Sequence, residues 1–223
     1  MKYILSCIIL TVNLVCFAQD KNNGPENAPA LPRFAVRGNI GIPKVVSSQS
    51  FRNSFSGVIE GNANVTCKLV SDFFFGFGYS YTYYKPQKVF RDQGVNTNMQ
   101  SQNGYLKLGY DKFFSSTGFA TFSVNMGYNF NQYKGLRYRS DTLIGKYPTE
   151  FVSAFVEPVV GIYFIVDPNF AIGAHLSYNY NFSKYDPTYP GFDRWFDYKQ
   201  VKNNWNMSMI TLGFGFYYGL QRK

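Results

Sequence analysis

Three residues of the sequence could form a hydrolytic site. His175 and Ser177 are separated by one residue, and Glu157 lies in the preceding segment of the chain. In an extended strand, side chains two residues apart point to the same face, so His175 and Ser177 would project together. If the turn Asp167-Pro168-Asn169 sets the register, Glu157 lies across from Ser177. A serine beside a histidine that a carboxylate orients can act as an activated nucleophile. The alternative is a hydrogen-bonded network without catalysis.

Charged residues at alternate positions of otherwise apolar segments form a second group. Three are positive and three are negative: Arg37, Lys68 and Lys107, and Glu60, Asp111 and Glu157. Because an unpaired charge is costly to bury, side chains of both signs that share an enclosed space are expected to pair. The balance of signs therefore predicts an ion-paired network in the interior.

Aromatic and basic residues in two polar segments are candidates for binding. They are Arg137, Tyr138 and Arg139 in one segment, and Trp195 and Phe196 in the other. Exposed aromatic residues with arginine are typical of binding hot spots, although anchoring at a lipid interface explains them equally well. The spacing of Asp186, Asp193 and Asp197 matches no calcium loop. We therefore expect no metal site, and no motif indicates a cofactor.

The segments that must position these residues have a period of two. From Val152 to Phe164 and from Phe170 to Phe182, apolar residues alternate with mostly polar or small ones. This period predicts extended strands with two different faces. The strands are long enough to cross a bilayer at a tilt, with the apolar face towards lipid. Six further segments show the same alternation: 34–42, 55–69, 73–83, 106–111, 121–131 and 209–219.

The connections between these segments alternate between long and short. Long loops are predicted at 43–54, 85–103, 134–150 and 185–204, and short turns at 71–72, 115–118 and 167–169. Short periplasmic turns and long outer loops are typical of outer-membrane barrels, which have an even number of strands. We therefore predict an all-β fold, a monomeric eight-stranded antiparallel up-and-down transmembrane β-barrel.

Composition and the N-terminal residues indicate export. The apolar run after Lys2 predicts a secretory signal peptide over residues 1–18, followed by a flexible periplasmic lead-in over 19–32, the barrel over 33–220 and a tail over 221–223. The alternative, a lipoprotein acylated on Cys16, is disfavoured by Val15 before it. Export argues against nucleic acid as the partner of a chain with net charge +9. Two explanations of the charge remain: contact with anionic outer-membrane lipids and lipopolysaccharide, or, equally well, solvated loops at the rim.

Three aromatic and glycine-rich motifs carry a resemblance to a known class: Phe75-Gly76-Phe77-Gly78-Tyr79, Met126-Gly127-Tyr128-Asn129-Phe130 and Leu212-Gly213-Phe214-Gly215-Phe216. The chain resembles the small outer-membrane barrels of the OmpA and OmpX type, and more closely the PorT-like "outer membrane protein beta-barrel" family common in Bacteroidota. This resemblance implies insertion into the bacterial outer membrane by the barrel assembly machinery, with both termini periplasmic. It implies no catalytic motif. Such barrels usually end on an aromatic residue, whereas this chain continues through Gln221-Arg222-Lys223.

The function that we expect is not enzymatic. A structural, adhesion or secretion-accessory role through the outer loops is predicted, with an extracellular or secretion-system protein as partner. One alternative is a lipid A deacylase of the PagL type, which also uses a His-x-Ser pair with a carboxylate. The inward phase of His175 and Ser177, close to a periplasmic turn, argues against it. The other is a narrow passive channel, although an eight-stranded barrel is only wide enough for side chains to fill it.

Overall fold

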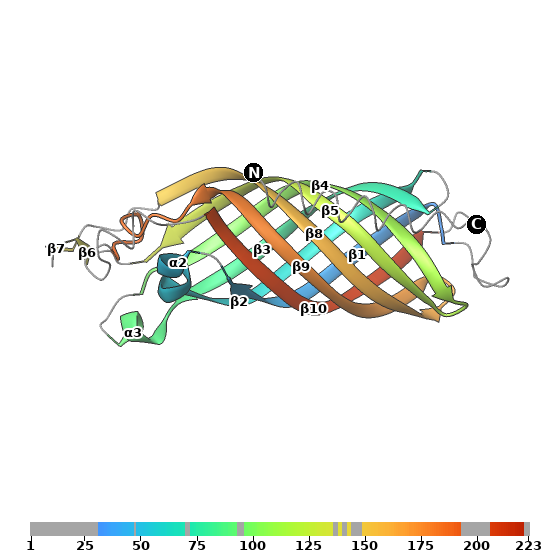
Figure 1. Ribbon diagram of the computed structural model, residues 1–223, viewed down its shortest axis with the longest axis horizontal. Helices are drawn as coiled ribbons and strands as arrows, with labels where there is room; N and C mark the ends of the chain where they lie inside the picture. Colours follow the sequence, from blue (N-terminus) through green and yellow to red (C-terminus); the bar gives the residue numbers. More distant parts are fainter. Residues whose placement is uncertain are drawn as a thin grey trace.

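The computed structural model describes residues 31–46, 48–69, 72–92, 96–135, 138–139, 142–143, 149–192 and 206–220 (Figure 1). The predicted signal peptide, nearly all of the predicted lead-in and the tail over 221–223 lie outside these residues. No helix in the described ranges is long and apolar enough to cross a bilayer.

Eight long strands form one closed barrel, which confirms the predicted fold class. Around the barrel the order is β1-β10-β9-β8-β5-β4-β3-β2, and every neighbouring pair is antiparallel. The bounds are β1 (Phe34–Val45), β2 (Phe55–Lys68), β3 (Phe73–Pro86), β4 (Asn98–Ser115), β5 (Gly118–Lys134), β8 (Thr149–Asp167), β9 (Phe170–Lys184) and β10 (Asn206–Leu220).

Smaller elements lie at one end of the barrel, which we call the loop end (Figure 1). They are the helices α2 (Gln49–Ser54) and α3 (Lys88–Arg91) and the two-stranded sheet of β6 (Tyr138–Arg139) and β7 (Thr142–Leu143). The short connections predicted after β2, β4 and β8 lie at the opposite end, which we call the turn end. The predicted alternation of long and short connections is therefore confirmed.

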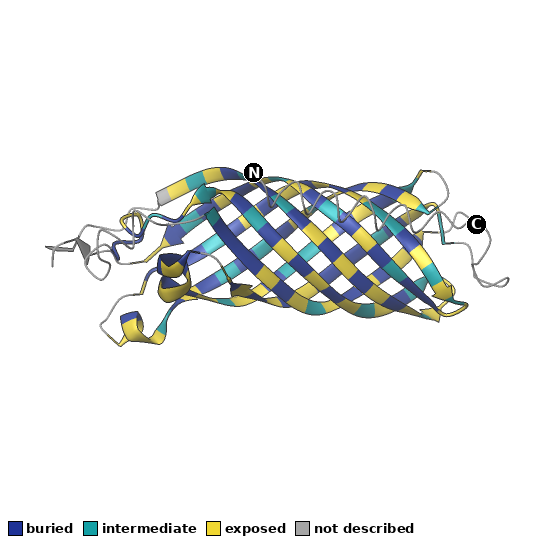
Figure 2. Cartoon of the chain, viewed as in Figure 1, coloured by how far each residue is buried: buried dark blue, intermediate teal, exposed yellow. Residues whose placement is uncertain are grey.

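The two faces of the strands differ as their period of two predicts. Exposed and buried residues alternate over most of the length of the long strands, which gives the chequered pattern of Figure 2. The exposed positions carry large apolar side chains around the whole circumference, among them Ile40, Phe77, Leu106, Met126, Val160, Leu176 and Phe214. An apolar outer surface of this extent suits lipid and would be unfavourable in water.

One prediction of side-chain phase is wrong at the start of β2. Phe55 was expected on the outer face, but its side chain is only 1% exposed. A bulge explains the difference, because Gly57 pairs with Tyr84 whereas Ile59 pairs with Tyr83. Val58 is therefore an extra residue, and the side chains before it change face.

The loop predicted over 85–103 is shorter than expected, because β4 already begins at Asn98. The outward positions of its first part carry Gln100, Gln102 and Gly104, so no apolar alternation marks this part as strand. Pairing with β3 and β5 nevertheless continues to Met99 and Asn98, respectively.

The register predicted between β8 and β9 is also wrong. Val159, and not Glu157, lies opposite Ser177, while His175 lies opposite Gly161. A register shift of one residue lies between Ile165 and Asp167, next to the tight turn. Glu157 is therefore displaced by two residues along β8 from the position that a triad with Ser177 would require.

Candidate functional site

The inward face of the barrel is the candidate site, because it holds nearly all of the predicted site residues that the structure describes. It has three layers. Apolar and aromatic side chains close the loop end and the turn end, and polar side chains fill the space between them. The chemistry of this space depends on which polar groups pair with one another.

Arg37 and Asp111 form the strongest contact in the polar layer. Nη2 of Arg37 lies 2.6 Å from Oδ2 of Asp111, and Nη1 donates to Oδ1 at 3.0 Å, so the pair is bidentate. Nε of Arg37 donates to Thr66 at 3.2 Å. The guanidinium also lies 4.0 Å from the ring centroid of Phe74 and 5.0 Å from that of Tyr217. Both charges are thus neutralised where water is excluded.

The other lumen charges are joined through neutral side chains. Nζ of Lys107 donates to Oδ1 of Asn125 at 3.2 Å, and Nδ2 of Asn125 donates to Oε2 of Glu157 at 2.9 Å. Glu60 accepts a hydrogen bond from the hydroxyl of Thr211 at 2.6 Å. Direct ion pairs were expected at these positions. Instead, the amide of Asn125 lies between Lys107 and Glu157, and the hydroxyl of Thr211 takes the place of a cation beside Glu60.

Lys68 does not belong to this network, which corrects its predicted place in the lumen. Its Nζ lies 3.0 Å from Oδ1 of Asp72, four residues later in the chain, and both side chains are partly exposed. The reason is position: Lys68 is the last residue of β2, at the turn end, where the strand ends and its side chain is partly exposed.

Glu157, His175 and Ser177 do not form a catalytic arrangement. Glu157 accepts from Asn125, whereas Nδ1 of His175 and Oγ of Ser177 have no hydrogen-bond partner in the described part of the chain. Both of these side chains are only 3% exposed and face the lumen. Among the described residues, no hydrogen bond therefore joins Nδ1 of His175 to a carboxylate or to Ser177, as an activated serine would require.

Asparagine and serine side chains connect three strands, β5, β8 and β9, in the half of the lumen nearer the loop end. Asn129 of β5 donates to Asn181 of β9, and Oδ1 of Asn129 accepts from Asn131 and from Ser153 of β8. Asn181 donates to Asn179 at 2.9 Å. The inward phase of these residues was predicted, but their pairing was not, because the direction of an amide side chain depends on the three-dimensional register.

The loop end of the lumen is filled by what we call the aromatic cap. Its buried members are Val45, Phe51, Phe55, Tyr84, Phe90, Met99, Tyr133, Tyr185, Phe192, Met207 and Met209. Phe51 comes from α2, Phe90 from α3 and Phe192 from the loop after β9, so residues of three loops pack together with residues of the strands. The rings of Phe90 and Phe192 stack with their centroids 4.7 Å apart.

The sequence around α2 explains how this helix enters the cap. Ser48 is the N-cap residue, and its hydroxyl accepts from the backbone N–H of Phe51 at 3.4 Å. Phe51 is then 0% exposed and lies against Phe55, Tyr84 and Tyr185. Sequence reasoning missed this role because α2 is too short to show a helical period.

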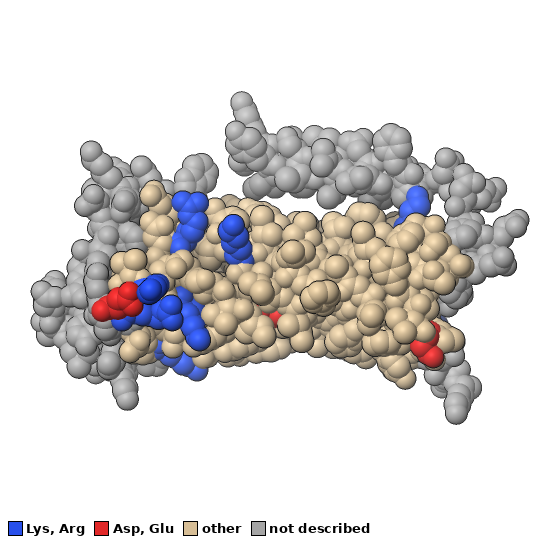
Figure 3. Space-filling model, turned by 90° about the horizontal axis from the view of Figure 1, so that it is seen from below, with Lys and Arg blue, Asp and Glu red and all other residues tan. Residues whose placement is uncertain are grey.

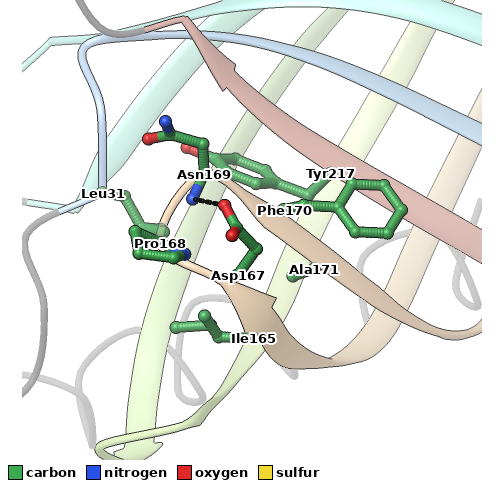
Figure 4. Close-up of a pocket in the computed structure, with 8 residues that line it drawn as sticks. All are labelled: Leu31, Ile165, Asp167, Pro168, Asn169, Phe170, Ala171 and Tyr217. Carbon is green, nitrogen blue, oxygen red and sulfur yellow. Dashed lines mark hydrogen bonds between the residues drawn. The ribbon is translucent and has the colours of Figure 1, made fainter.

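The turn end is closed by a smaller cluster made of Ala35, Phe119, Tyr163, Ala171 and Tyr217, with Leu31, Phe113 and Ile165 packed against it. A depression beside it is lined by Leu31, Tyr217 and the residues of the β8–β9 turn (Figure 4). Its volume is about 10 Å³. A cavity needs about 10–15 Å³ of such space to hold a single water molecule, so this depression is too small for an organic ligand.

The predicted binding residues of the loops are mostly outside the described ranges. This applies to Arg137, Trp195 and Phe196, while Tyr138 and Arg139 are described only as the backbone of β6. Asp186, considered as a calcium ligand, instead accepts from the backbone N–H and the hydroxyl of Thr188. Within the described ranges, no group of three or more His, Cys, Asp or Glu residues is arranged to hold a metal ion.

The comparison with Neisserial surface protein A supports the fold. No family model and no curated protein sequence matches the chain. Neisserial surface protein A is 16% identical, with a TM-score of 0.55 over 86% of this chain and 99% of that one. Ail, the attachment invasion locus protein of Yersinia pestis, is 11% identical, with a TM-score of 0.47 over 85% and 100%. The outer membrane protein OprG from Pseudomonas aeruginosa is 10% identical, with a TM-score of 0.47 over 87% and 99%.

Proposed function

We propose that the protein is an outer-membrane β-barrel with a packed lumen that presents its loops at the cell surface. The observation that carries this proposal is the combination of a continuous apolar outer surface with an interior filled by paired side chains. The apolar outer surface requires lipid around the barrel. The filled interior leaves the loops as the surface that is free to contact a partner.

The aromatic cap supports a role in presentation. Phe51, Phe90 and Phe192 fix three loops to the barrel wall, so the residues next to them have defined positions. Lys88 and Val89 of α3 and Tyr189 after β9 are exposed beside these anchors. Ordered loops lose less conformational entropy when a partner binds. We propose an extracellular protein or a component of a secretion system as that partner.

The alternative functions fit the interior less well. In the described part of the lumen, the Arg37–Asp111 pair and the aromatic clusters occupy the path that a narrow channel would need. A lipid A deacylase would need its nucleophile to meet lipid, whereas Ser177 faces the lumen and is 3% exposed. We therefore propose a protein without hydrolytic activity. Membership of the PorT-like family, suggested by the glycine and aromatic motifs, is part of the proposal.

The orientation of the barrel can be tested by labelling single cysteines in intact cells, in a Cys67→Ser background. Cysteines in place of Lys88 and Thr188, both exposed at the loop end, should react with a membrane-impermeant maleimide. Ser116 lies in the turn between β4 and β5, so a cysteine there should react only after the outer membrane is permeabilised. Labelling with the opposite polarity would show that the loop end faces the periplasm.

The role of the loops needs a separate test. A deletion strain should be complemented with the wild-type protein and with a variant in which Lys88-Val89-Phe90-Arg91 of α3 is replaced by Gly-Ser-Gly-Ser. Adhesion to a surface, protein secretion and lipid A composition are then compared. We expect a defect in adhesion or secretion with unchanged lipid A. An altered lipid A profile in the deletion strain, restored by the wild type but not by Ser177→Ala, would instead support the deacylase.

A further inference from the structure

Four lysines mark the loop end of the outer surface. In β1, β3, β5 and β9, the chain runs towards the loop end, and the last exposed, outward residue of each strand is a lysine. These residues, which we call the lysine collar, are Lys44, Lys85, Lys134 and Lys184. The collar continues the outward phase of each strand, so its side chains stand on the outer wall and not in the lumen.

The collar surrounds the barrel at regular intervals. Its four strands alternate with β10, β8, β4 and β2 in the closed order, so one lysine occurs at every second strand. On the intervening strands, the first outward residues at this end are Asn206, Asn98 and Ser56, which are neutral, and Glu150 on β8. Positive charge is therefore spread around the circumference with one carboxylate among the strand ends.

Three collar lysines stand directly at the border of the apolar outer surface, because the preceding outward residues are Ile42, Tyr83 and Phe182. Lys134 is separated from this surface by Gln132. An aliphatic lysine stem can lie along such a surface while its ammonium group reaches the layer of lipid headgroups. The turn end differs, because Arg33 and Lys112 are the exposed cations of the described residues there. Figure 3 shows the visible Lys and Arg side chains gathered mainly towards the loop end.

Further cations strengthen the collar on the side of β1, β2 and β3. Arg52 of α2 and Lys88 and Arg91 of α3 are exposed, and Asp92 is the neighbouring carboxylate. Gln87 holds the two helices together, because its side chain donates to the backbone oxygens of Arg52 and Phe55. In the described residues, no carboxylate lies within 4 Å of any of these cations or of the collar lysines.

We propose that the lysine collar binds the phosphate groups of anionic lipids in the leaflet at the loop end. Among the described residues these charges have no carboxylate partner, they recur around the barrel at one height, and three of the four collar lysines stand directly above apolar outward side chains. The fitting lipid is a phosphorylated glycolipid of the lipopolysaccharide type, whose phosphates lie at the border between acyl chains and sugar. This inference rests on the proposed position in the outer membrane and adds the lipid class and the residues that select it.

The test measures lipid selectivity at the surface of the refolded barrel. The protein is reconstituted in phosphatidylcholine vesicles, and electron spin resonance gives the association constant of spin-labelled phosphatidic acid relative to spin-labelled phosphatidylcholine. The wild type should prefer phosphatidic acid, with a contribution of about fivefold from each lysine that contacts a phosphate. K44Q/K85Q/K134Q/K184Q should remove most of the preference, with Arg52, Lys88 and Arg91 supplying what remains, and replacement of the same four lysines by arginine should retain it.

Matched variants make the test specific. The double variant K44Q/K134Q should lose part of the preference, while R33Q/K112Q, which removes two cations at the turn end, should retain all of it. Unlabelled lipopolysaccharide should displace the spin-labelled lipid from the wild type, whereas inorganic phosphate at the same phosphate concentration should not. An equal loss in K44Q/K134Q and R33Q/K112Q would overturn the collar as a site, as would displacement by inorganic phosphate.

The two proposals can fail separately. Heat-modifiable mobility on gels reports whether each variant has folded and inserted, and K44Q/K134Q provides the selectivity measurement if the quadruple variant does not fold. A barrel that inserts in phosphatidylcholine but shows no preference for the anionic lipid would overturn the collar alone. A wild-type chain that never inserts into a bilayer would overturn the proposed function itself.

Discussion

The polar layer and the aromatic cap occupy the same inward surface, but they are stabilised differently. In the polar layer, Arg37 and Asp111 are held by directional contacts whose partners must be present together. In the cap, Phe51 is buried among other rings, where each contact is small and the total depends on the area buried. The polar layer is therefore sensitive to the loss of a charged or hydrogen-bonding partner more than to a change in side-chain shape. The cap is sensitive to a change in the shape of a buried side chain more than to which neighbour it contacts.

This difference separates two tasks of the lumen. The polar layer lies at the height of the lipid-facing surface and connects strands across the barrel, as Arg37 of β1 does with Asp111 of β4. The cap joins loops to strands at one end. Damage to the polar layer should therefore weaken the whole barrel, whereas damage to the cap should release the loops first.

The largest effect is expected when one member of the central ion pair is removed. Asp111→Ala leaves the guanidinium of Arg37 buried without a counter-charge, which should lower the free energy of unfolding by about 3–5 kcal/mol. Urea unfolding of the protein in lipid vesicles, followed by tryptophan fluorescence, measures this change. The double variant Arg37→Met/Asp111→Leu is the control and should lose much less. Equal losses in both would mean that packing, and not charge, matters at this site.

A smaller loss with a local consequence is expected in the cap. Phe51→Ala removes a fully buried ring and should cost about 3 kcal/mol, at the low end for phenylalanine because loops at the end of the barrel can relax. The change should also increase protease cleavage after Lys88 and Arg91 of α3 without affecting the mobility of the folded barrel on gels. Cleavage that stays as slow as in the wild type would show that α2 and α3 are held independently of Phe51.

The smallest effect is expected at Ser177. Its hydroxyl has no partner in the described residues, so Ser177→Ala should change the free energy of unfolding by less than about 0.5 kcal/mol. Asn125→Ala is the matched control from the same layer and should cost more, because Asn125 contacts both Lys107 and Glu157. The same unfolding experiment measures both. If Ser177→Ala lowered the free energy of unfolding as much as Asn125→Ala, the Ser177 hydroxyl would have a hydrogen-bond partner beyond the contacts described above.

The fold could be predicted from the sequence because lipid-facing and lumen-facing residues alternate over most of each strand. The prediction is confirmed for residues such as Leu106, whose side chain points outward, and Asn125, whose side chain points into the lumen. It failed where a local irregularity changes the phase, as at Val58, and where outward residues are not apolar, as at Gln100 and Gln102. A bulge inserts one residue without changing the composition of the strand. The alternation of apolar and polar residues therefore does not show where the inward and outward positions exchange.

Less of the candidate site could be predicted, because its contacts depend on register across several strands. The inward phase of Arg37 and Asp111 was readable, but their pairing spans β1 and β4, which are not neighbours in the barrel. The supposed triad shows the limit most clearly, since an offset of two residues along β8 separates Glu157 from Ser177. The cap was missed because Phe51, Phe90 and Phe192 stand in segments with no period.

The pairing of β1 with β10 has a consequence for how the chain acquires its structure. Phe34 lies opposite Leu220 and Val45 lies opposite Met209, so the first and last strands meet. Contacts between such distant residues carry a large loop-closure entropy and slow folding. Until β10 is in place, β1 and β9 each present an unpaired edge whose backbone groups can join another chain. Every intermediate that lacks β10 is therefore prone to aggregate. Without this strand, the remaining seven strands would not form a smaller closed barrel.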